Sequence, residues 1–186
     1  MTEESAPIPT PDRRARGWGV FFAWAIVLGI LALLAFGLQQ ANRGPLEIGK
    51  PAPDFVLTTF DRDSIDTVGL RGQVVLVNIW ASWCVECVYE AAELEQAYQM
   101  FKDRGVVFLG VAWSDTEAKA LEYLERHGIT YPNGPDMGGR IHKQYRITGV
   151  PETFIIDPDG LLSSLRIGPY ASLDEIVNAV EAALAP

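Results

Sequence analysis

Cysteine, histidine and positive charge are scarce in this 186-residue chain. It holds two Cys and two His, and 24 acidic residues against 15 basic ones give a formal net charge of −9. Two cysteines exclude the multi-disulfide framework of a small secreted domain, and a chain of this length buries a core without one. The negative charge argues against binding of the folded part to nucleic acid or to an anionic membrane surface. The two cysteines are therefore free for chemistry.

One hydrophobic run, residues 17–38, contains no ionisable side chain in 22 positions. At about 1.5 Å per residue, a helix of this length crosses a hydrocarbon core of roughly 30 Å. Three arginines precede the run whereas only Arg43 follows it closely, so the positive-inside rule predicts a cytoplasmic amino end. A cleaved signal peptide is the alternative, because Ala35 and Gly37 are small residues of the kind found before a cleavage site. Signal peptides have apolar regions of only about 7–15 residues, which favours a retained anchor.

A stretch rich in Gly and Pro separates this run from the rest of the chain, and it indicates a semi-extended tether. The predicted organisation is a cytoplasmic N-terminus at 1–16, a transmembrane anchor at 17–38, a linker at 39–53 and an exported domain at 54–186.

Within that domain, two apolar runs at 74–80 and 106–112 lack alternation, which is typical of parallel strands covered on both faces. Apolar residues at helical spacing follow each run, from Leu94 to Phe101 and from Ala120 through Leu121 to Leu124. The pattern predicts a βαβα unit.

The chain then ends in a different arrangement. Residues 153–156 and 161–167 flank Asp157-Pro158-Asp159-Gly160, which has Pro and Gly at the positions that a type I turn favours. This pattern predicts a hairpin, and an amphipathic helix follows at 173–184, with Ser172 as its cap. Parallel strands followed by a hairpin predict an α/β fold with a mixed sheet.

The pattern Trp83-Cys84-Val85-Glu86-Cys87 stands directly between the first strand and its helix. At a helix start, unpaired backbone N–H groups stabilise a thiolate at Cys84, and Cys87 lies within reach of a disulfide bond. Cys84 is the predicted nucleophile, and Cys87 resolves a mixed disulfide by attacking the Cys84 sulfur.

Other interpretations of the two cysteines are weaker. A structural disulfide over so short a loop removes little unfolded-chain entropy. A zinc site would need both His127 and His142, which lack compact ligand spacing and are expected to be a helix-end residue and a solvated residue. Covalent haem attachment requires His after the second Cys, where Val88 stands. No metal site and no cofactor are predicted.

Two motifs together carry a family resemblance. The segment from Asn78 to Cys87, followed by Gly149-Val150-Pro151-Glu152-Thr153-Phe154 and preceded by an Ala-Pro-Asp-Phe entry at 52–55, resembles the membrane-anchored thioredoxin-like proteins of the TlpA/ResA/CcmG (DsbE) type. The resemblance implies a thioredoxin fold with a mixed central sheet flanked by helices. It also implies that Pro151 is a cis proline facing the disulfide. Trp83 and the backbone of Val150 would then bind an extended substrate.

Two carboxylates lead to separate hypotheses. Glu90 matches the family's glutamate near the redox pair, and Asn78 stands where cytoplasmic thioredoxins carry a buried Asp. We expect Glu90 to exchange the proton of Cys87, which requires a pKa raised by burial; the alternative is a solvated helix carboxylate. Glu86 stands where the family often has Pro. Its charge opposes a thiolate at Cys84, which favours the disulfide form and a reducing protein.

The residues after the second strand have two interpretations. Trp113, Ser114 and Asp115 follow the strand, at the edge of the sheet where sites commonly form. They either line a specificity groove or, as the favoured interpretation, begin the next helix with Ser114 or Asp115 as its cap.

The predicted function is a membrane-tethered, extracytoplasmic thiol-disulfide oxidoreductase of the bacterial cell membrane. The resemblance implies reduction of the haem-site cysteines of apocytochrome c, with electrons from a membrane dithiol donor of the CcdA or DsbD type. A general reductase of exported disulfide proteins is an alternative. A copper-handling module is another, although such modules typically have three residues between the cysteines and a His ligand, and here there are two.

Overall fold

The computed structural model describes residues 13–41 and 44–185. The chain divides into two compact units, Met1–Arg43 and Gly44–Pro186. The proposed N-terminal segment 1–16 lies mostly outside the described residues.

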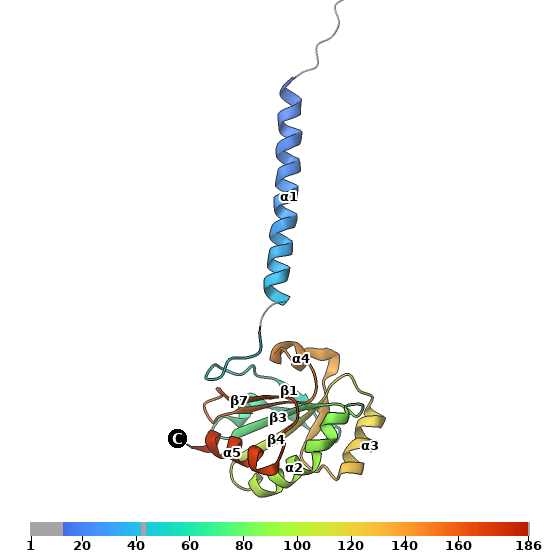
Figure 1. The fold of residues 1–186 in the computed structure, drawn as a ribbon, viewed down its shortest axis with the longest axis vertical. Helices are drawn as coiled ribbons and strands as arrows, with labels where there is room; N and C mark the ends of the chain where they lie inside the picture. Colours follow the sequence, from blue (N-terminus) through green and yellow to red (C-terminus); the bar gives the residue numbers. More distant parts are fainter. Residues whose placement is uncertain (1–12, 42–43, 186) are drawn as a thin grey trace, which may run out of the picture. The chain divides into compact units, whose positions relative to one another are not determined.

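The described residues of the first unit form the helix α1, Arg13–Ala41 (Figure 1). Its stretch Trp18–Leu38 has a mean hydropathy of 2.6, and none of it is buried against protein. The helix is therefore long and apolar enough to span a membrane, as a signal sequence near an N-terminus also is.

The second unit is built on a five-stranded sheet in the order β5-β4-β3-β6-β7. Strands β3, β4 and β5 are parallel, whereas β6 and β7 run antiparallel to their neighbours, so the predicted mixed sheet is confirmed. The strands are β3 Val74–Trp80, β4 Val106–Ala112, β5 Asn133–Pro135, β6 Glu152–Ile156 and β7 Leu162–Ile167.

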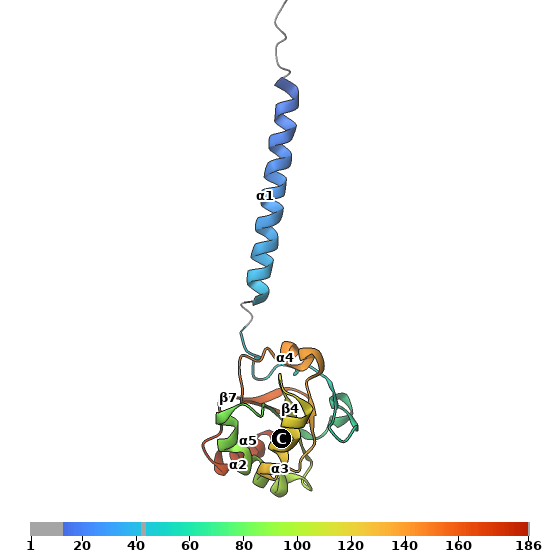
Figure 2. The ribbon, with the colours of Figure 1, turned by 90° about the vertical axis from the view of Figure 1, so that its right-hand side faces the viewer.

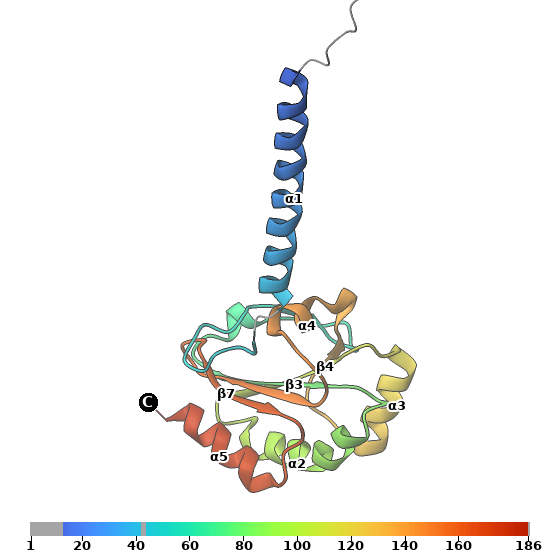
Figure 3. The same ribbon diagram turned by 45° about the horizontal axis from the view of Figure 1, so that its top comes forward.

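Helices cover both faces of this sheet (Figures 2 and 3). The helices α2 (Val85–Phe101), α3 (Glu117–His127) and α5 (Leu173–Leu184) pack on one face. The other face is covered by α4 (Arg140–Tyr145) and by the segment that holds the small hairpin β1-β2. The remaining short elements are β1 Val56–Thr58, β2 Ser64–Asp66, η1 Thr67–Leu70 and η2 Met137–Gly139.

The side chains of β3 point alternately to one and the other of these two layers, and so divide the core between them. Leu76 packs with Leu94 of α2 and Ile176 of α5, whereas Val77 packs with Tyr145 of α4. All seven β3 residues are buried, which explains why its sequence shows no alternation of apolar and polar residues. Both faces of the strand require apolar side chains.

The predicted hairpin and final helix are confirmed. The N–H of Gly160 donates to the carbonyl of Asp157 at 2.9 Å, which closes the turn between β6 and β7. At the start of α5, the Oγ of Ser172 accepts the N–H of Glu175 at 3.4 Å, as expected of a helix cap. Local signals therefore determine the ends of these elements.

The end of the predicted linker differs from expectation. The N–H groups of Gly49 and Ala52 donate to Leu162 and Gly160, and Ala52 is buried. Residues 49–52 are therefore part of the folded unit, because they supply backbone partners to the end of the β6-β7 hairpin.

The start and the inner face of α3 also require correction. Thr116 is the N-cap, since its Oγ1 accepts the N–H of Lys119, so neither Ser114 nor Asp115 caps this helix. Leu121, predicted to face the core, is 44% exposed, whereas Tyr123 is buried against Trp80 with ring centroids 4.6 Å apart. The apolar pattern did not include Tyr123, which is the large side chain that α3 buries.

Candidate active site

The two cysteines form a disulfide bond at the start of α2, with their Cα atoms 5.4 Å apart. Cys84 is the N-cap of the helix, and its Sγ accepts the N–H of Cys87 at 3.1 Å. Both residues are buried, Cys84 at 5% exposed and Cys87 at 2%. In the reduced chain, the same N–H and the helix dipole stabilise a thiolate on Cys84.

Exposed apolar side chains surround the disulfide. Trp83 is 55% exposed, and Val85 and Tyr89, on the first turns of α2, are 69% and 66% exposed. Exposed aromatic and aliphatic groups beside a reactive sulfur suit contact with another polypeptide.

Trp113 links this surface to α4. Its ring lies 5.9 Å from that of Trp83, whose Nε1 donates to the carbonyl of Ser114 at 3.1 Å. On the other side, Trp113 stacks on His142 with centroids 4.7 Å apart and planes inclined by 5°. The expectation that His142 is simply solvated was wrong, because the indole covers one face of the imidazole.

Asp115 holds the loop that precedes the disulfide. Its carboxylate accepts the Ser82 N–H and the Ser82 hydroxyl, the latter at 2.9 Å. This contact joins the end of β4 to the loop that leads to Cys84. Asp115 therefore lies beside the loop that leads to Cys84 and does not cap α3, whereas a specificity groove at this place stays a prediction.

The peptide bond between Val150 and Pro151 is cis. Val150 packs against the side-chain cluster that contains Cys84 and Cys87, and the Pro151 carbonyl accepts the Gly168 N–H at 2.9 Å. The loop before β6 is therefore next to the redox pair.

Glu152 fixes this loop, a role that the sequence reasoning missed. It is 2% exposed, and its Oε1 accepts the N–H and hydroxyl of Thr148, both at 2.8 Å, and the N–H of Gly149 at 3.1 Å. A buried carboxylate with three donors orients the backbone just before Val150. The only sequence signal was its place directly after Pro151.

Glu90 is buried on α2, with only 1% of its surface exposed, so it is not a solvated helix carboxylate. Its Oε1 accepts Asn78 Nδ2 at 2.9 Å, and its Oε2 accepts the Tyr170 N–H at 2.8 Å. Burial raises the pKa of Glu90 from its ordinary 4.5 to about 7, although the hydrogen bonds from Tyr170 and Asn78 and the cation of Arg166 act in the opposite direction. The carboxyl group exchanges protons near neutral pH.

Asn78 belongs to a row of residues paired across the whole sheet. The row runs through Asn133 of β5, Gly110 of β4, Asn78 of β3, Thr153 of β6 and Arg166 of β7. Asn78 Nδ2 also donates to Thr153 Oγ1 at 3.0 Å. Directly paired residues point to the same face of a sheet, so this row supports Glu90 on the side covered by α2.

Glu86 lies exposed in the first turn of α2. We expect Glu86→Pro to raise the reduction potential of the disulfide by at most about 30 mV, because removing a negative charge near Cys84 favours the thiolate and so the dithiol form. A redox titration measures the shift. Glu86→Gln removes only the charge and should give a similar shift, which 1 M salt suppresses. A more reducing Glu86→Pro protein would contradict this account.

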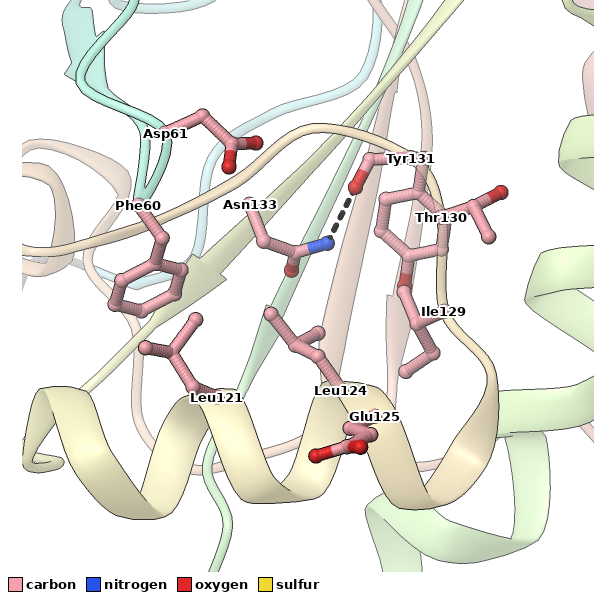
Figure 4. Close-up of a pocket in the computed structure, with 9 residues that line it drawn as sticks. All are labelled: Phe60, Asp61, Leu121, Leu124, Glu125, Ile129, Thr130, Tyr131 and Asn133. Carbon is pink, nitrogen blue, oxygen red and sulfur yellow. Dashed lines mark hydrogen bonds between the residues drawn. The ribbon is translucent and has the colours of Figure 1, made fainter.

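A pocket of about 360 Å³ lies on another part of the domain, between α3, Phe60 and the segment that leads into β5 (Figure 4). Asn133 lies at its inner side and donates to the carbonyl of Tyr131 at 2.8 Å. Acidic side chains at the rim are Asp61 and Glu125.

Within residues 13–41 and 44–185, no three His, Cys, Asp or Glu side chains gather as a ligand set for a metal ion. His127 ends α3, as expected, and its ring lies 4.5 Å from that of Tyr123.

Known proteins resemble this chain in sequence and fold. The model of the AhpC/TSA family matches residues 48–164. The thiol:disulfide interchange protein DsbE of Allochromatium vinosum is 40% identical over 77% of this chain and 81% of its own. The thiol-disulfide oxidoreductase ResA of Bacillus thuringiensis is 29% identical over 80% of this chain and 88% of its own.

A solved structure gives the same result for the fold. The thiol:disulfide interchange protein of Chlorobium tepidum, a thioredoxin family protein, superposes with a TM-score of 0.68 at 28% identity. The match covers 76% of this chain and all of the other. The predicted thioredoxin fold and the predicted kind of chemistry are both confirmed.

Proposed function

Because the chain belongs to the AhpC/TSA family and is a thiol-disulfide oxidoreductase of the DsbE and ResA type, we propose that it reduces disulfide bonds of exported proteins. The observation that carries the proposal is the Cys84–Cys87 disulfide at the start of α2, packed beside the loop with the cis bond before Pro151. The proposed substrate is the pair of haem-attachment cysteines of apocytochrome c. Two points support this substrate. The chain is similar to DsbE, and the two haem-attachment cysteines are a pair that can form the disulfide bond that this chemistry reduces.

The reaction is an exchange of two electrons. In the reduced chain, the Cys84 thiolate attacks one sulfur of the substrate disulfide, and the other substrate sulfur leaves as a thiolate. The Cys87 thiolate then attacks Cys84 Sγ, which releases the second substrate sulfur and forms the Cys84–Cys87 disulfide. The substrate is reduced and this chain is oxidised. A membrane dithiol donor of the CcdA or DsbD type returns the chain to the dithiol form.

Glu90 is the proposed proton acceptor for Cys87. Cys87 must lose its proton to attack, and the thiolates leaving the substrate must gain protons. A carboxyl group that exchanges its proton near pH 7 and lies three residues after Cys87 on the same helix suits both steps.

The proposed substrate site combines three groups. An extended segment binds along the backbone of Val150 beside Pro151, which has no N–H of its own, while exposed Trp83 packs against the segment. Asp115 and Glu152 fix the two loops of this site, as their hydrogen bonds indicate.

We further propose that residues 17–38 anchor the protein in the bacterial cell membrane in a single pass. Residues 1–16 are then cytoplasmic, and the domain from residue 54 onward, extended by the paired segment 49–52, is extracytoplasmic. The support is the apolar helix Trp18–Leu38 together with the arginines that precede it.

Trapping tests this function directly. We expect Cys87→Ala to accumulate a mixed disulfide through Cys84, because the resolving sulfur is absent. Mass spectrometry identifies the captured protein, and apocytochrome c is the expected one. A Cys84→Ala/Cys87→Ala double variant is the matched control and should capture nothing.

Other captured proteins distinguish the alternatives. Capture of a broad set of exported proteins would indicate a general disulfide reductase instead of a reductase of apocytochrome c. The absence of any adduct, together with retention of one Cu(I) ion by the reduced protein, would overturn the proposed function in favour of copper handling.

A further inference from the structure

Arg166, near the end of β7, is placed to act on Glu90 through the turn that follows the strand. Its Nε and Nη2 both donate to the carbonyl of Pro169, at 3.1 and 2.9 Å. The next residue, Tyr170, donates its N–H to Glu90 Oε2 at 2.8 Å. The guanidinium therefore fixes the peptide unit between Pro169 and Tyr170, whose N–H binds the Glu90 carboxylate.

Two further observations place Arg166 beside the same network. Its guanidinium carbon lies 5.6 Å from the centroid of the Tyr170 ring. Arg166 also pairs with Thr153, which pairs with Asn78, the second hydrogen-bond donor to Glu90. Because paired residues share a face of the sheet, Arg166 lies on the Glu90 side. It is the half-exposed end of the row across the sheet, whose other members are buried.

We infer that Arg166 is a positioning residue that, by holding the Pro169–Tyr170 peptide against Glu90 and by its positive charge, keeps Glu90 able to release its proton at neutral pH. The inference rests on the proposed role of Glu90 and adds a residue outside the redox motif. Without a nearby cation and a fixed N–H donor, a carboxyl group this deeply buried stays protonated at higher pH.

The other groups around Glu90 do not provide this charge. Glu93 on α2 is negative, and Tyr123, Tyr131 and Tyr170, from α3 and the neighbouring loops, are neutral at pH 7. Glu175 on α5 lies 3.7 Å from Arg166 Nη2 and partly offsets its charge. Among these groups Arg166 alone favours the carboxylate by its charge.

The test compares pH profiles of the full-length reduced chain reacting with a synthetic peptide whose two cysteines, separated by two residues, form a disulfide. Carboxyl ¹³C NMR of labelled Glu follows Glu90 directly. Each measurement gives a midpoint, one for the pH profile of the rate and one for the titration of Glu90. We expect Arg166→Gln to move both midpoints upward by about half a pH unit or more, since it removes the cation and frees the turn. Arg166→Lys keeps the charge but not the two-donor contact, so a smaller upward shift is expected.

Arg104→Gln is the matched control, because Arg104 has similar exposure and pairs at 2.9 Å with Glu181 on the surface. It should leave both midpoints unchanged. Unchanged midpoints in Arg166→Gln, or in Arg166→Lys if the Gln variant fails to fold, overturn the inference. The role of Glu90 is judged separately: it fails if Glu90→Gln retains the wild-type pH step, whatever Arg166 does.

Discussion

Glu90→Gln is expected to slow reduction of a peptide disulfide roughly 100-fold at pH 7, at the lower end of what a positioned acid or base contributes. In the wild-type chain the rate should rise with pH through the Glu90 pKa of about 7, as the carboxylate becomes able to accept the Cys87 proton. In the variant, the rate should follow only the titration of the thiols and lose the step that belongs to Glu90. Stopped-flow rates between about pH 5.5 and 9 measure this difference.

Gln is the informative substitution because it preserves the shape of the site. Its carbonyl oxygen still accepts the Tyr170 N–H, and its amide N–H₂ meets the side chain of Asn78. Asn78 can rotate its amide to present oxygen, and the hydroxyl of Thr153 then donates to it in place of accepting. The change therefore removes the titratable group while the side chain at position 90 keeps its contacts with Tyr170 and Asn78.

Stability provides an independent measure of the same group. The pKa of Glu90 is higher in the folded chain than in the unfolded one, so its contribution to the free energy of unfolding is fully present below about pH 4.5 and is lost as pH rises toward 7. A difference of about 2.5 pH units corresponds to a loss of about 3 kcal/mol. Glu90→Gln should lack this part of the pH dependence in urea unfolding of the oxidised chain.

These measurements can contradict the account in two ways. An unaltered pH profile in Glu90→Gln would show that another group handles the Cys87 proton. If the unfolding free energy of Glu90→Gln changed with pH as steeply as that of the wild type between pH 4.5 and about 7, Glu90 would not be the buried group that titrates there.

The sequence predicts the longer strands and helices of the domain because these elements depend on local patterns. The apolar run 74–80 becomes β3, the turn 157–160 closes the hairpin, and Ser172 caps α5. Each signal lies within a few residues of the feature that it specifies. The cysteine motif likewise needs only its position before α2.

Short elements could not be predicted in this way. Strands β1, β2 and β5 have three residues each, too few to show a period of two. Of these three, β5 pairs with the more distant strand β4, whereas β1 and β2 pair with each other in a short hairpin. Helix α4 has six residues and two buried side chains, which is too short for a helical pattern to stand out.

The supporting contacts of the site depend on burial and packing that the sequence does not display. Asp115 binds Ser82 and Glu152 binds Thr148, and a single sequence does not tell a binding carboxylate from a solvated one. Burial of Glu90 follows from its place against Asn78 and Tyr170, which only the packed sheet and helices bring together. The family resemblance identified Glu90, and the packing supplied the reason for its raised pKa.

Gly110→Ala is expected to give the largest loss of stability, roughly 3–5 kcal/mol. Gly110 lies on β4 between Asn78 and Asn133 in the row across the sheet. An added Cβ would overlap the Asn133 side-chain oxygen, so Asn133 must move. That oxygen accepts Trp80 Nε1 at 2.8 Å, and Trp80 is 2% exposed. The variant therefore combines overpacking with a buried N–H that loses its acceptor.

Urea unfolding of the full chain measures this loss, and Gly69→Ala is the matched control. Gly69 has an ordinary backbone conformation and open space around its Cα, so its variant should stay within about 0.5 kcal/mol of wild type.

A double variant tests the proposed cause. Asn133→Ala alone leaves Trp80 Nε1 unpaired and should cost about 1–3 kcal/mol. In the Gly110→Ala background, however, Asn133 has already been displaced, and shortening it relieves the overlap. The two changes should therefore be non-additive by at least about 1 kcal/mol, with the double variant no less stable than Gly110→Ala alone. Simple additivity would mean that the packing of Gly110 against Asn133 is not what requires glycine at this position.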